Sequence, residues 1–390
     1  MKEPSHHAEP RPPVSQVLFV NELRLNARQW IVVSCLVVSA FVLAPRIWTR
    51  LERFETGPDY RIPYPLSKDY WLYERRLEGV ADPSKVVLLG DSVVWGEYVL
   101  PDGSLSHFLN REAGERERFI NGGVNGLFPL AMEGLIRSYG GALRKRKVMV
   151  QCNVLWMSSP KADLQVRKEE KFNHSRLTPQ FLPVIPCYAA DAQERLGVLI
   201  ERNCAFFSWV SHLQSAYLDD RSILSWTLLE SDENPPRYPN SYKNPLSQIT
   251  WKVPVESTPD SQRGPSSPRH KAWDAAGRNL VRFDWVDLET SLQWSAFQRL
   301  VSLLELRDND VLVVFGPFNE HMMDSESRAR FERVRADIVS ALQRRQIPVV
   351  AAPVLPSELY ADASHPLTAG YERLAKTVYE DPVFVEWLGR

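Results

Sequence analysis

The sequence lacks the features that mark nucleic-acid-binding and metal-binding proteins. Its 47 Lys and Arg are balanced by 48 Asp and Glu, which gives a formal net charge of −1. Basic runs such as Arg144–Lys147 are short and more typical of a solvated helix end than of a phosphate-binding patch. No CxxC or HExxH spacing occurs, and the eight histidines are scattered. We therefore expect no nucleic-acid partner and no structural or catalytic metal.

Cysteine is also scarce, with four in 390 residues, which excludes a disulfide scaffold. Cys187 and Cys204 could pair in an oxidising compartment, but two buried thiols are the favoured interpretation. No internal repeat is present. The 44% hydrophobic and 24% charged residues are those of an ordinary globular protein, and the length allows one large domain or two ordinary ones.

One long uncharged run lies near the N-terminus. Residues 30–48 carry no charge until Arg46 and are bracketed by Trp30 and Trp48, a residue type that favours the membrane interface. The uncharged core, Ile31–Pro45, is short for a membrane span, but tryptophan and a snorkelling arginine can extend it. We expect residues 30–48 to be a transmembrane anchor in contact with the lipid bilayer, standing apart from the folded domain. Residues 1–29, polar and proline-rich, are expected to be disordered.

Two alternatives to an uncleaved anchor stay open. A cleaved signal peptide is disfavoured because about thirty residues precede the run and no Ala-x-Ala follows it. A buried core helix is the other alternative, given the shortness of the run. Arg24 and Arg28 lie shortly before the run, and Arg46, Arg50 and Arg53 come directly after it, so the charges do not fix the orientation in the membrane.

Beyond a juxtamembrane linker at 49–83, the pattern becomes strand, loop and helix, repeated. Residues 327–345 place Phe331, Val334, Ile338 and Leu342 on one helical face, with arginines on the other. Strands that alternate with helices predict an α/β domain with a central parallel sheet covered on both faces. The predicted strands are Val86–Leu89, Arg118–Asn121, Lys147–Cys152, Val311–Phe315 and Pro348–Ala351.

The alternation breaks at residues 158–290, which we interpret as an insertion. Its first half is helical in pattern, whereas Ser231–His270 contains eight prolines and is expected to be a long irregular loop. Several of the twelve tryptophans fall in or near the insertion. They could form a sugar-stacking platform, although packing is the favoured role. These tryptophans are Trp209, Trp226, Trp251, Trp273, Trp285 and Trp294.

The tripeptide Gly90-Asp91-Ser92 follows the first predicted strand. Ligands of open parallel sheets bind beyond the carboxyl ends of the strands, where Ser92 would lie. If a helix starts near Val93, backbone N–H groups around Ser92 could stabilise an oxyanion. The alternative is a turn in which Asp91 or Ser92 merely caps the next helix.

A serine nucleophile needs a base, and the segment "YADASHPLTAGYERLA" offers one. Asp362 and His365 are three residues apart, so one helical-type turn brings both side chains to the same side. The carboxylate could orient the imidazole and leave its other nitrogen free for Ser92. The alternative is a surface histidine with Asp362 as a helix cap.

Together, the two motifs resemble the SGNH (GDSL-type) hydrolase superfamily over residues 84–157 and 295–378. The resemblance implies a flavodoxin-like three-layer α/β sandwich for residues 84–390, with a Ser92–His365–Asp362 triad that needs no cofactor. It also implies an oxyanion hole built from the Ser92 N–H, the glycine of "INGGVNGLFP" (Gly126) and an asparagine after the third strand. Asn153 in "VMVQCNVLW" matches that asparagine, and Asn319 in "FGPFNEH" is the less favoured candidate. This sequence departs from the family's third block because Gln151 and Val154 replace its glycine and aspartate.

The resemblance implies ester chemistry, either hydrolysis or O-acyl transfer, on an acyl ester or an envelope carbohydrate. Membrane-anchored members of the superfamily often act outside the cytoplasm, so an extracytoplasmic (periplasmic) domain is expected, with a membrane acyl-transfer protein as a possible partner. A catalytically inactive SGNH-like module that binds glycans or acts as a scaffold is the alternative, motivated by the departures at Gln151 and Val154.

Overall fold

The computed structural model describes residues 25–80, 82–166, 172–227, 244–256 and 271–389, and a five-stranded all-parallel sheet lies at its centre. The strand order β2-β1-β3-β4-β5 is the order of flavodoxin-like doubly wound sheets. All five strands begin and end within one residue of the predicted bounds. They are β1 (Val86–Leu89), β2 (Phe119–Asn121), β3 (Lys147–Cys152), β4 (Asp310–Phe315) and β5 (Val349–Ala351).

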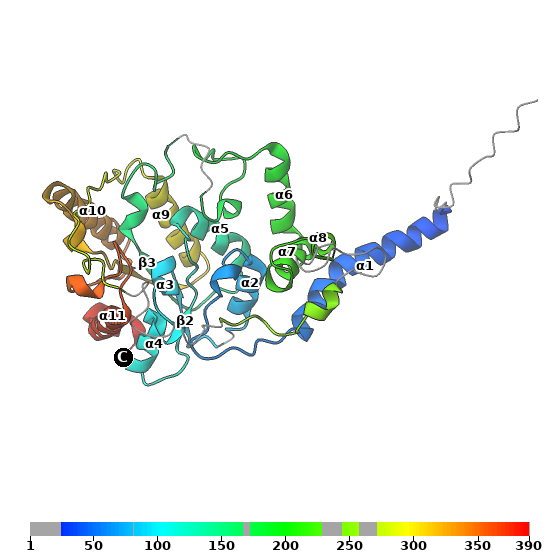
Figure 1. The fold of residues 1–390 in the computed structure, drawn as a ribbon, viewed down its shortest axis with the longest axis horizontal. Coiled ribbons are helices and arrows are strands. Elements are labelled where there is room, and N and C mark those ends of the chain that lie inside the picture. The colour runs from blue at the N-terminus through cyan, green and yellow to red at the C-terminus, as the bar shows by residue number, and fades with distance from the viewer. Residues whose placement is uncertain (1–24, 81, 167–171, 228–243, 257–270, 390) are drawn as a thin grey trace, which may run out of the picture.

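Helices cover both faces of this sheet, which gives three layers (Figure 1). Because side chains alternate along a strand, Val87 and Leu89 face one core, whereas Val86 and Leu88 face the other. The first core is covered by α2 (Tyr70–Glu78), α5 (Pro129–Tyr139), α9 (Leu292–Glu305) and α10 (Ser325–Arg344). The second is covered by α4 (Leu105–Glu112), α11 (Thr368–Glu380) and α12 (Pro382–Leu388). The face predicted for residues 327–345 is the buried face of α10.

The segment expected to be a linker is instead part of the first core. Tyr60, Ile62 and Leu66 are buried there together with the apolar face of α2. Arg61 is buried as well, and its guanidinium donates to the carbonyl oxygens of Trp95, Gly96 and Val99. Part of the expected linker therefore contributes apolar side chains, between Tyr60 and Val80, to the domain core.

The insertion contributes α6 (Ala192–Asn203), α7 (Ala205–Tyr217) and α8 (Ile223–Thr227), at the end of the domain from which α1 projects (Figure 1). The short 3-10 helix η3 (Val154–Met157) follows β3, and further such turns lie at Ser175–Leu177 and Pro245–Gln248. Most of the predicted irregular loop lies outside the described residues. Cys187 and Cys204 are both thiols and not joined by a disulfide, and Cys187 is buried as predicted, whereas Cys204 is only partly buried.

The tryptophans near the insertion take part in packing. Trp285 and Trp294 belong to the first core, and Trp226 is buried beside α7 with Trp209 packed against it. Packing, the role favoured from the sequence, is thus the role that the structure shows for these four side chains.

Helix α1 (Ala27–Leu51) contains the predicted anchor and is long and apolar enough to span a membrane. Only 6% of its most apolar 18-residue window is buried, which argues against the core-helix alternative. The predicted disordered tail lies, up to residue 24, outside the described residues. The helix does not stand wholly apart from the domain, because Phe41, Pro45 and Trp48 face the insertion.

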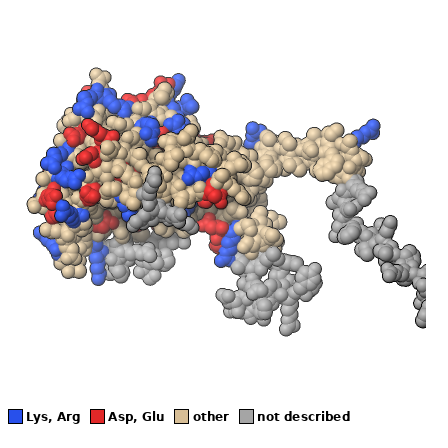
Figure 2. All heavy atoms as spheres, turned by 90° about the horizontal axis from the view of Figure 1, so that it is seen from above, with Lys and Arg blue, Asp and Glu red and all other residues tan. Residues whose placement is uncertain are grey.

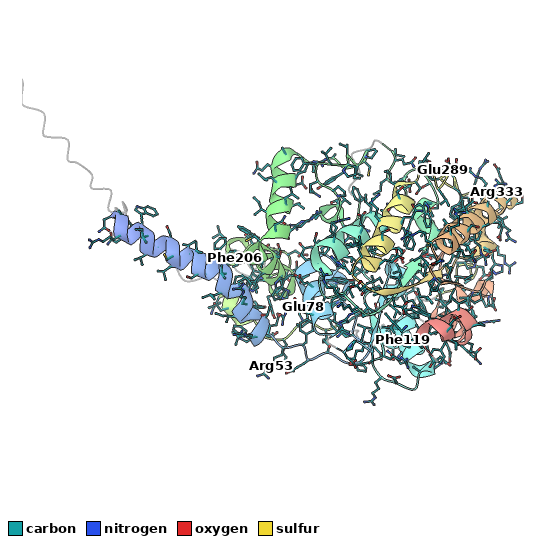
Figure 3. All side chains as sticks on the ribbon, turned by 180° about the vertical axis from the view of Figure 1, so that it is seen from behind. Arg53, Glu78, Phe119, Phe206, Glu289 and Arg333 are labelled. Atoms are coloured by element: carbon teal, nitrogen blue, oxygen red, sulfur yellow. The ribbon has the colours of Figure 1, made fainter. Side chains whose placement is uncertain are left out.

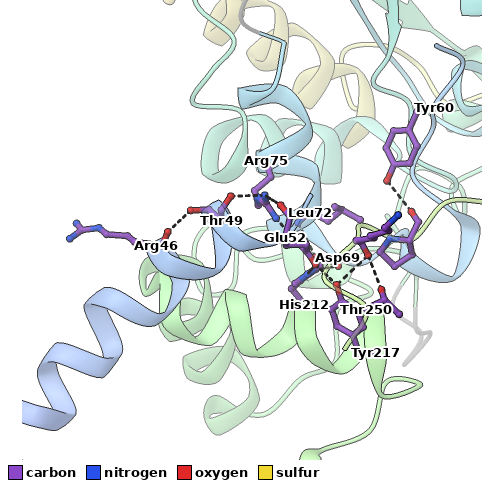
Figure 4. Close-up of polar contacts among 12 residues, drawn as sticks. Arg46, Thr49, Glu52, Tyr60, Asp69, Leu72, Arg75, His212, Tyr217 and Thr250 are labelled. Atoms are coloured by element: carbon purple, nitrogen blue, oxygen red, sulfur yellow. Dashed lines mark hydrogen bonds and ion pairs between the residues drawn. The ribbon is translucent and has the colours of Figure 1, made fainter. Parts of the chain in front are cut away.

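A buried polar cluster joins the end of α1 to the domain (Figure 4). His212 of α7 lies 2.6 Å from Asp69 through Nδ1 and 2.9 Å from Glu52 through Nε2, and Arg75 also binds Glu52. Burial alone would lower the pKa of His212, but the two carboxylates outweigh it and raise this pKa to about 9. A protonated His212 therefore bridges α7, α2 and the residue that caps α1.

Candidate active site

Ser92 begins the short helix α3 (Ser92–Trp95) directly after β1, at the carboxyl edge of the sheet. Asp91 is the N-cap of this helix, and its carboxylate accepts the Val93 N–H at 2.9 Å. The capping interpretation of the turn therefore holds for Asp91 and leaves the Ser92 hydroxyl available. A glycine is needed at position 90, because a Cβ there would lie 2.3 Å from the Val94 side chain.

The structure brings Ser92, His365 and Asp362 into one hydrogen-bonded chain, as the sequence predicted. His365 Nε2 lies 2.7 Å from Ser92 Oγ, although 273 positions separate the two residues. His365 Nδ1 lies 2.7 Å from Asp362 Oδ1, which also accepts the backbone N–H groups of Ser364 and His365 at 3.0 Å. The carboxylate thus fixes both the imidazole ring and the loop that carries it.

Electrostatics favour an ionised Asp362 and a basic His365. Burial opposes ionisation of Asp362, but its hydrogen bonds and charge interaction with His365 outweigh burial, so the pKa of Asp362 is lowered. Burial alone would lower the pKa of His365, but the hydrogen bond and charge of Asp362 outweigh it, so this pKa is raised. The ring is therefore a stronger base than a free histidine.

Asn153 follows β3, the neighbour of β1, and lies beside the Ser92 turn. Its side-chain Nδ2 donates to Asp91 Oδ2 at 3.0 Å, and its Oδ1 accepts the Leu155 N–H at 3.0 Å. An amide nitrogen has two hydrogens, so one remains for an oxyanion next to Ser92. Trp156 Nε1 also donates to Asp91 Oδ2, at 2.8 Å, so three donors hold this fully buried carboxylate.

Gly126 lies in the loop after β2 and has a φ of +71°, a conformation that favours glycine. Its neighbour Asn125 donates through Nδ2 to Glu97 Oε2 at 3.0 Å, and this Glu97 oxygen lies 3.7 Å from His365 Nε2. The Gly126 loop therefore borders the Ser92–His365 pair. A Cβ at position 126 would lie 2.5 Å from the Asn173 side chain, so the insertion closes over this loop.

Asn319, the less favoured oxyanion candidate, lies under the Asp362–His365 loop. Its backbone N–H donates to the Ala363 carbonyl at 2.8 Å, and its Nδ2 donates to the Asp362 carbonyl at 3.1 Å. These bonds aim its amide at the loop backbone, whereas the Asn153 amide is aimed at the turn that carries Ser92. The geometry therefore favours Asn153 for the oxyanion role.

Two side chains that face the imidazole were not predicted from the sequence. Glu97 places a second carboxylate near Nε2, and the Tyr98 ring meets His365 edge to face, with centroids 5.5 Å apart. Burial, and next the charges of Asp362 and Glu97, raise the pKa of Tyr98 to about 12, so it stays neutral. Both residues follow Ser92 closely in the chain, but no sequence motif indicates that they contact the histidine.

Gln151, which departs from the family pattern, is buried beneath the site. A Cβ on Gly90 would lie 2.8 Å from Gln151 Oε1, so this side chain fills the space under the Gly90 turn. Val154 is buried in the first core. Neither departure removes a group from the Ser92–His365–Asp362 chain.

A cavity of about 380 Å³ opens beside Gly126, on the side of the insertion. Apolar side chains dominate its wall, among them Phe128, Leu164 and Phe172. Within the described ranges, no group of three or more His, Cys, Asp or Glu is arranged to hold a metal ion. The chain matches no protein-family model and no curated protein.

Proposed function

We propose that this protein is a serine-dependent ester hydrolase or O-acyltransferase of the SGNH type. The observation that carries the proposal is the hydrogen-bonded chain from Ser92 through His365 to Asp362 at the carboxyl edge of the sheet. A hydroxyl, a base within hydrogen-bond reach and a carboxylate that orients the base form the constellation that activates a serine.

In the proposed reaction, Ser92 Oγ attacks the carbonyl carbon of an acyl ester while His365 Nε2 takes the hydroxyl proton. The carbonyl oxygen becomes an oxyanion, which the N–H groups of Ser92 and Gly126 and the side chain of Asn153 stabilise. His365 then gives the proton to the leaving alcohol, which leaves an acylated Ser92. Asp362 stays ionised throughout and stabilises the imidazolium.

The second half of the reaction separates hydrolase from transferase. Water attacks the acyl-serine in a hydrolase, whereas a sugar hydroxyl does so in an O-acyltransferase. In both cases His365 takes a proton from the attacking oxygen and returns it to Ser92 Oγ as the bond from Ser92 to the acyl group breaks. The apolar cavity beside Gly126 is suited to the acyl group, because it adjoins the loop that would hold the oxyanion. Anchoring by α1 would place the reaction at a membrane, where acylated envelope carbohydrates or a membrane acyl-transfer protein would be the partners.

Labelling with a fluorophosphonate probe tests the proposal most directly, since it needs an activated serine but no natural substrate. We expect labelling of the full chain, and none of Ser92→Ala or His365→Ala. Ser364→Ala is the matched control, because its buried hydroxyl lies next to His365 and has no hydrogen-bond partner among the described residues. An unlabelled wild-type protein with native circular dichroism would favour the inactive glycan-binding or scaffold module instead.

A further inference from the structure

The insertion presents an apolar surface next to α1. Helix α7 contains no Lys, Arg, Asp or Glu, and its only histidine, His212, is buried. Phe207 at its N-terminal end is 39% exposed, and Leu196 and Ile200 of the adjoining α6 are 54% and 46% exposed. We call the surface formed by Leu196, Ile200, Phe206 and Phe207 the α6–α7 apolar edge.

The α6–α7 apolar edge contacts α1 well inside the predicted membrane span. Phe41 of α1 stacks on Phe206, with ring centroids 4.0 Å apart, and meets Phe207 edge to face at 5.6 Å. Figure 3 shows Phe206 where α7 meets α1. Because these rings touch, the start of α7 lies at the same level along α1 as Phe41.

A second aromatic group marks a different level on the same helix. Trp48 of α1 meets Trp251 at 4.8 Å and Trp209 at 5.8 Å between ring centroids. Phe41 precedes Trp48 by seven residues, which corresponds to about 10 Å along an α-helix. If Trp48 and its neighbours lie at the membrane interface, as tryptophans prefer, Phe41 and Phe206 lie about 10 Å deeper, within a hydrocarbon core about 30 Å thick.

We propose that the α6–α7 apolar edge is embedded among the acyl chains of the leaflet on the side of the folded domain. The inference rests on the proposed membrane anchor but not on catalysis by Ser92. The bilayer is the expected occupant because the edge is continuous with the exposed apolar surface of α1. Figure 2 shows few charged residues along α1, whereas charged residues lie at its junction with the domain and over the rest of that face.

The contacts of His212 fix the position of α7 along α1, and with it the depth at which α7 lies in the membrane. Asp69 and Glu52 hold His212 from the main domain and from the end of α1, respectively. Helix α7 therefore cannot leave the level of Phe41 without breaking two buried contacts. The domain is expected to rest on the membrane at a fixed tilt.

Spin-label accessibility in the full chain tests the inference. Single cysteines would replace Val38, Phe207 or Leu306 in a background of Cys35→Ala and Cys204→Ser, and the protein would be reconstituted in phosphatidylcholine vesicles. Leu306 is the matched control, since it is apolar and 81% exposed but lies in the turn between α9 and β4. Accessibility to oxygen and to a polar nickel complex is then measured for each label by power saturation.

We expect the label at 207 to favour oxygen over nickel as the label at 38 does, and the label at 306 to favour nickel. Leu196→Cys provides a second position on the edge in case the change at Phe207 perturbs folding. An aqueous label at both 207 and 196, with 38 embedded, overturns the inference alone. Labels at 207 and 196 shielded from both reagents mean that protein covers the edge, which also overturns it.

An aqueous label at 38 overturns the anchor and this inference together. Fluorophosphonate labelling of Ser92 in the same samples reports on the proposed chemistry separately. Whatever depth the spin labels report, the catalytic proposal is therefore tested separately by fluorophosphonate labelling of Ser92.

Discussion

Replacing Asn153 with alanine tests the assignment of the oxyanion hole. Loss of one oxyanion donor typically lowers turnover by ~10²–10³-fold, or about 2.7–4 kcal/mol, with little change in substrate binding. The structure adds a cost in folding, because Asn153 also donates to Asp91 and accepts the Leu155 N–H. Asp91 keeps its bonds from Val93 and Trp156, so we expect the free energy of unfolding to fall by about 1–3 kcal/mol.

The assay measures kcat and KM on p-nitrophenyl acetate, together with denaturant unfolding of each variant. Asn153→Ala should lose turnover at every pH with KM nearly unchanged, because it removes a group that acts in the transition state. Asn319→Ala is the matched control, since it removes a side-chain amide that donates to the Asp362 carbonyl and, among the described residues, makes no bond to the Ser92 turn. It should lose less turnover, and its loss should depend on pH because it acts through Asp362 and His365.

The reverse ranking would transfer the oxyanion role to Asn319. Full turnover by a folded Asn153→Ala protein would show that the backbone N–H groups of Ser92 and Gly126 suffice. Either result would refute the inference drawn from the bond between Asn153 and Asp91.

Three further changes test the electrostatics of the site and of the junction with α1. Turnover should rise with pH with a midpoint above 6.5, because the pKa of His365 is raised and the ring is protonated at pH values below that pKa. Glu97→Gln removes a charge 3.7 Å from Nε2 and should move the midpoint of the pH–rate profile to lower pH. A midpoint that moves to higher pH would contradict this role of Glu97. Trp156→Phe removes one of three donors to the buried Asp91, so denaturant titration should show a loss of about 1–3 kcal/mol, and an unchanged midpoint would count against that bond. The pKa of His212 is raised to about 9 in the folded protein, so its contribution, on the order of 3 kcal/mol, is complete below pH 6.5 and is lost as pH rises through 9. Thermal unfolding from pH 6 to 10 should show this loss in the wild type and not in His212→Gln, and parallel curves for the two proteins would disprove it.

The strands were predictable because each lies buried on both faces of a parallel sheet. Such strands are nearly continuous apolar runs, and the five runs found in the sequence agree with the structure within one residue. The candidate triad was predictable for a related reason. Ser92 follows β1 and the Asp362–His365 loop follows β5, so both belong to the same edge of the sheet.

The core role of residues 60–80 was not predictable from the pattern. Apolar residues alternate there with prolines and charges, and Arg61 reads as a solvent-exposed residue. In the structure, its guanidinium caps the end of α3 and stacks on Trp95, with 3.9 Å between the guanidinium carbon and the ring centroid. A buried arginine of this kind depends on carbonyl groups far along the chain, which a local pattern does not contain.

The positions of Glu97 and Tyr98 beside His365 were not predictable from the sequence, for a conformational reason. Gly96 has a φ of +91° and Tyr98 a φ of +67°, so the chain turns sharply after α3. That turn directs both side chains toward His365, whereas a continued helix would have carried them away. Positive φ is rare for tyrosine, so no propensity scale places it there.

The same stretch of chain ties the candidate nucleophile to the candidate anchor. Glu52 holds the end of α1 to His212, and nine residues later Arg61 clamps the end of the helix that starts at Ser92. Because the intervening chain contributes buried residues to the core, the site has no long tether on which to move away from α1. An enzyme built in this way would work at one height above the bilayer. Under the proposed function, a substrate held at a membrane surface would suit this architecture better than one reached in the bulk solvent.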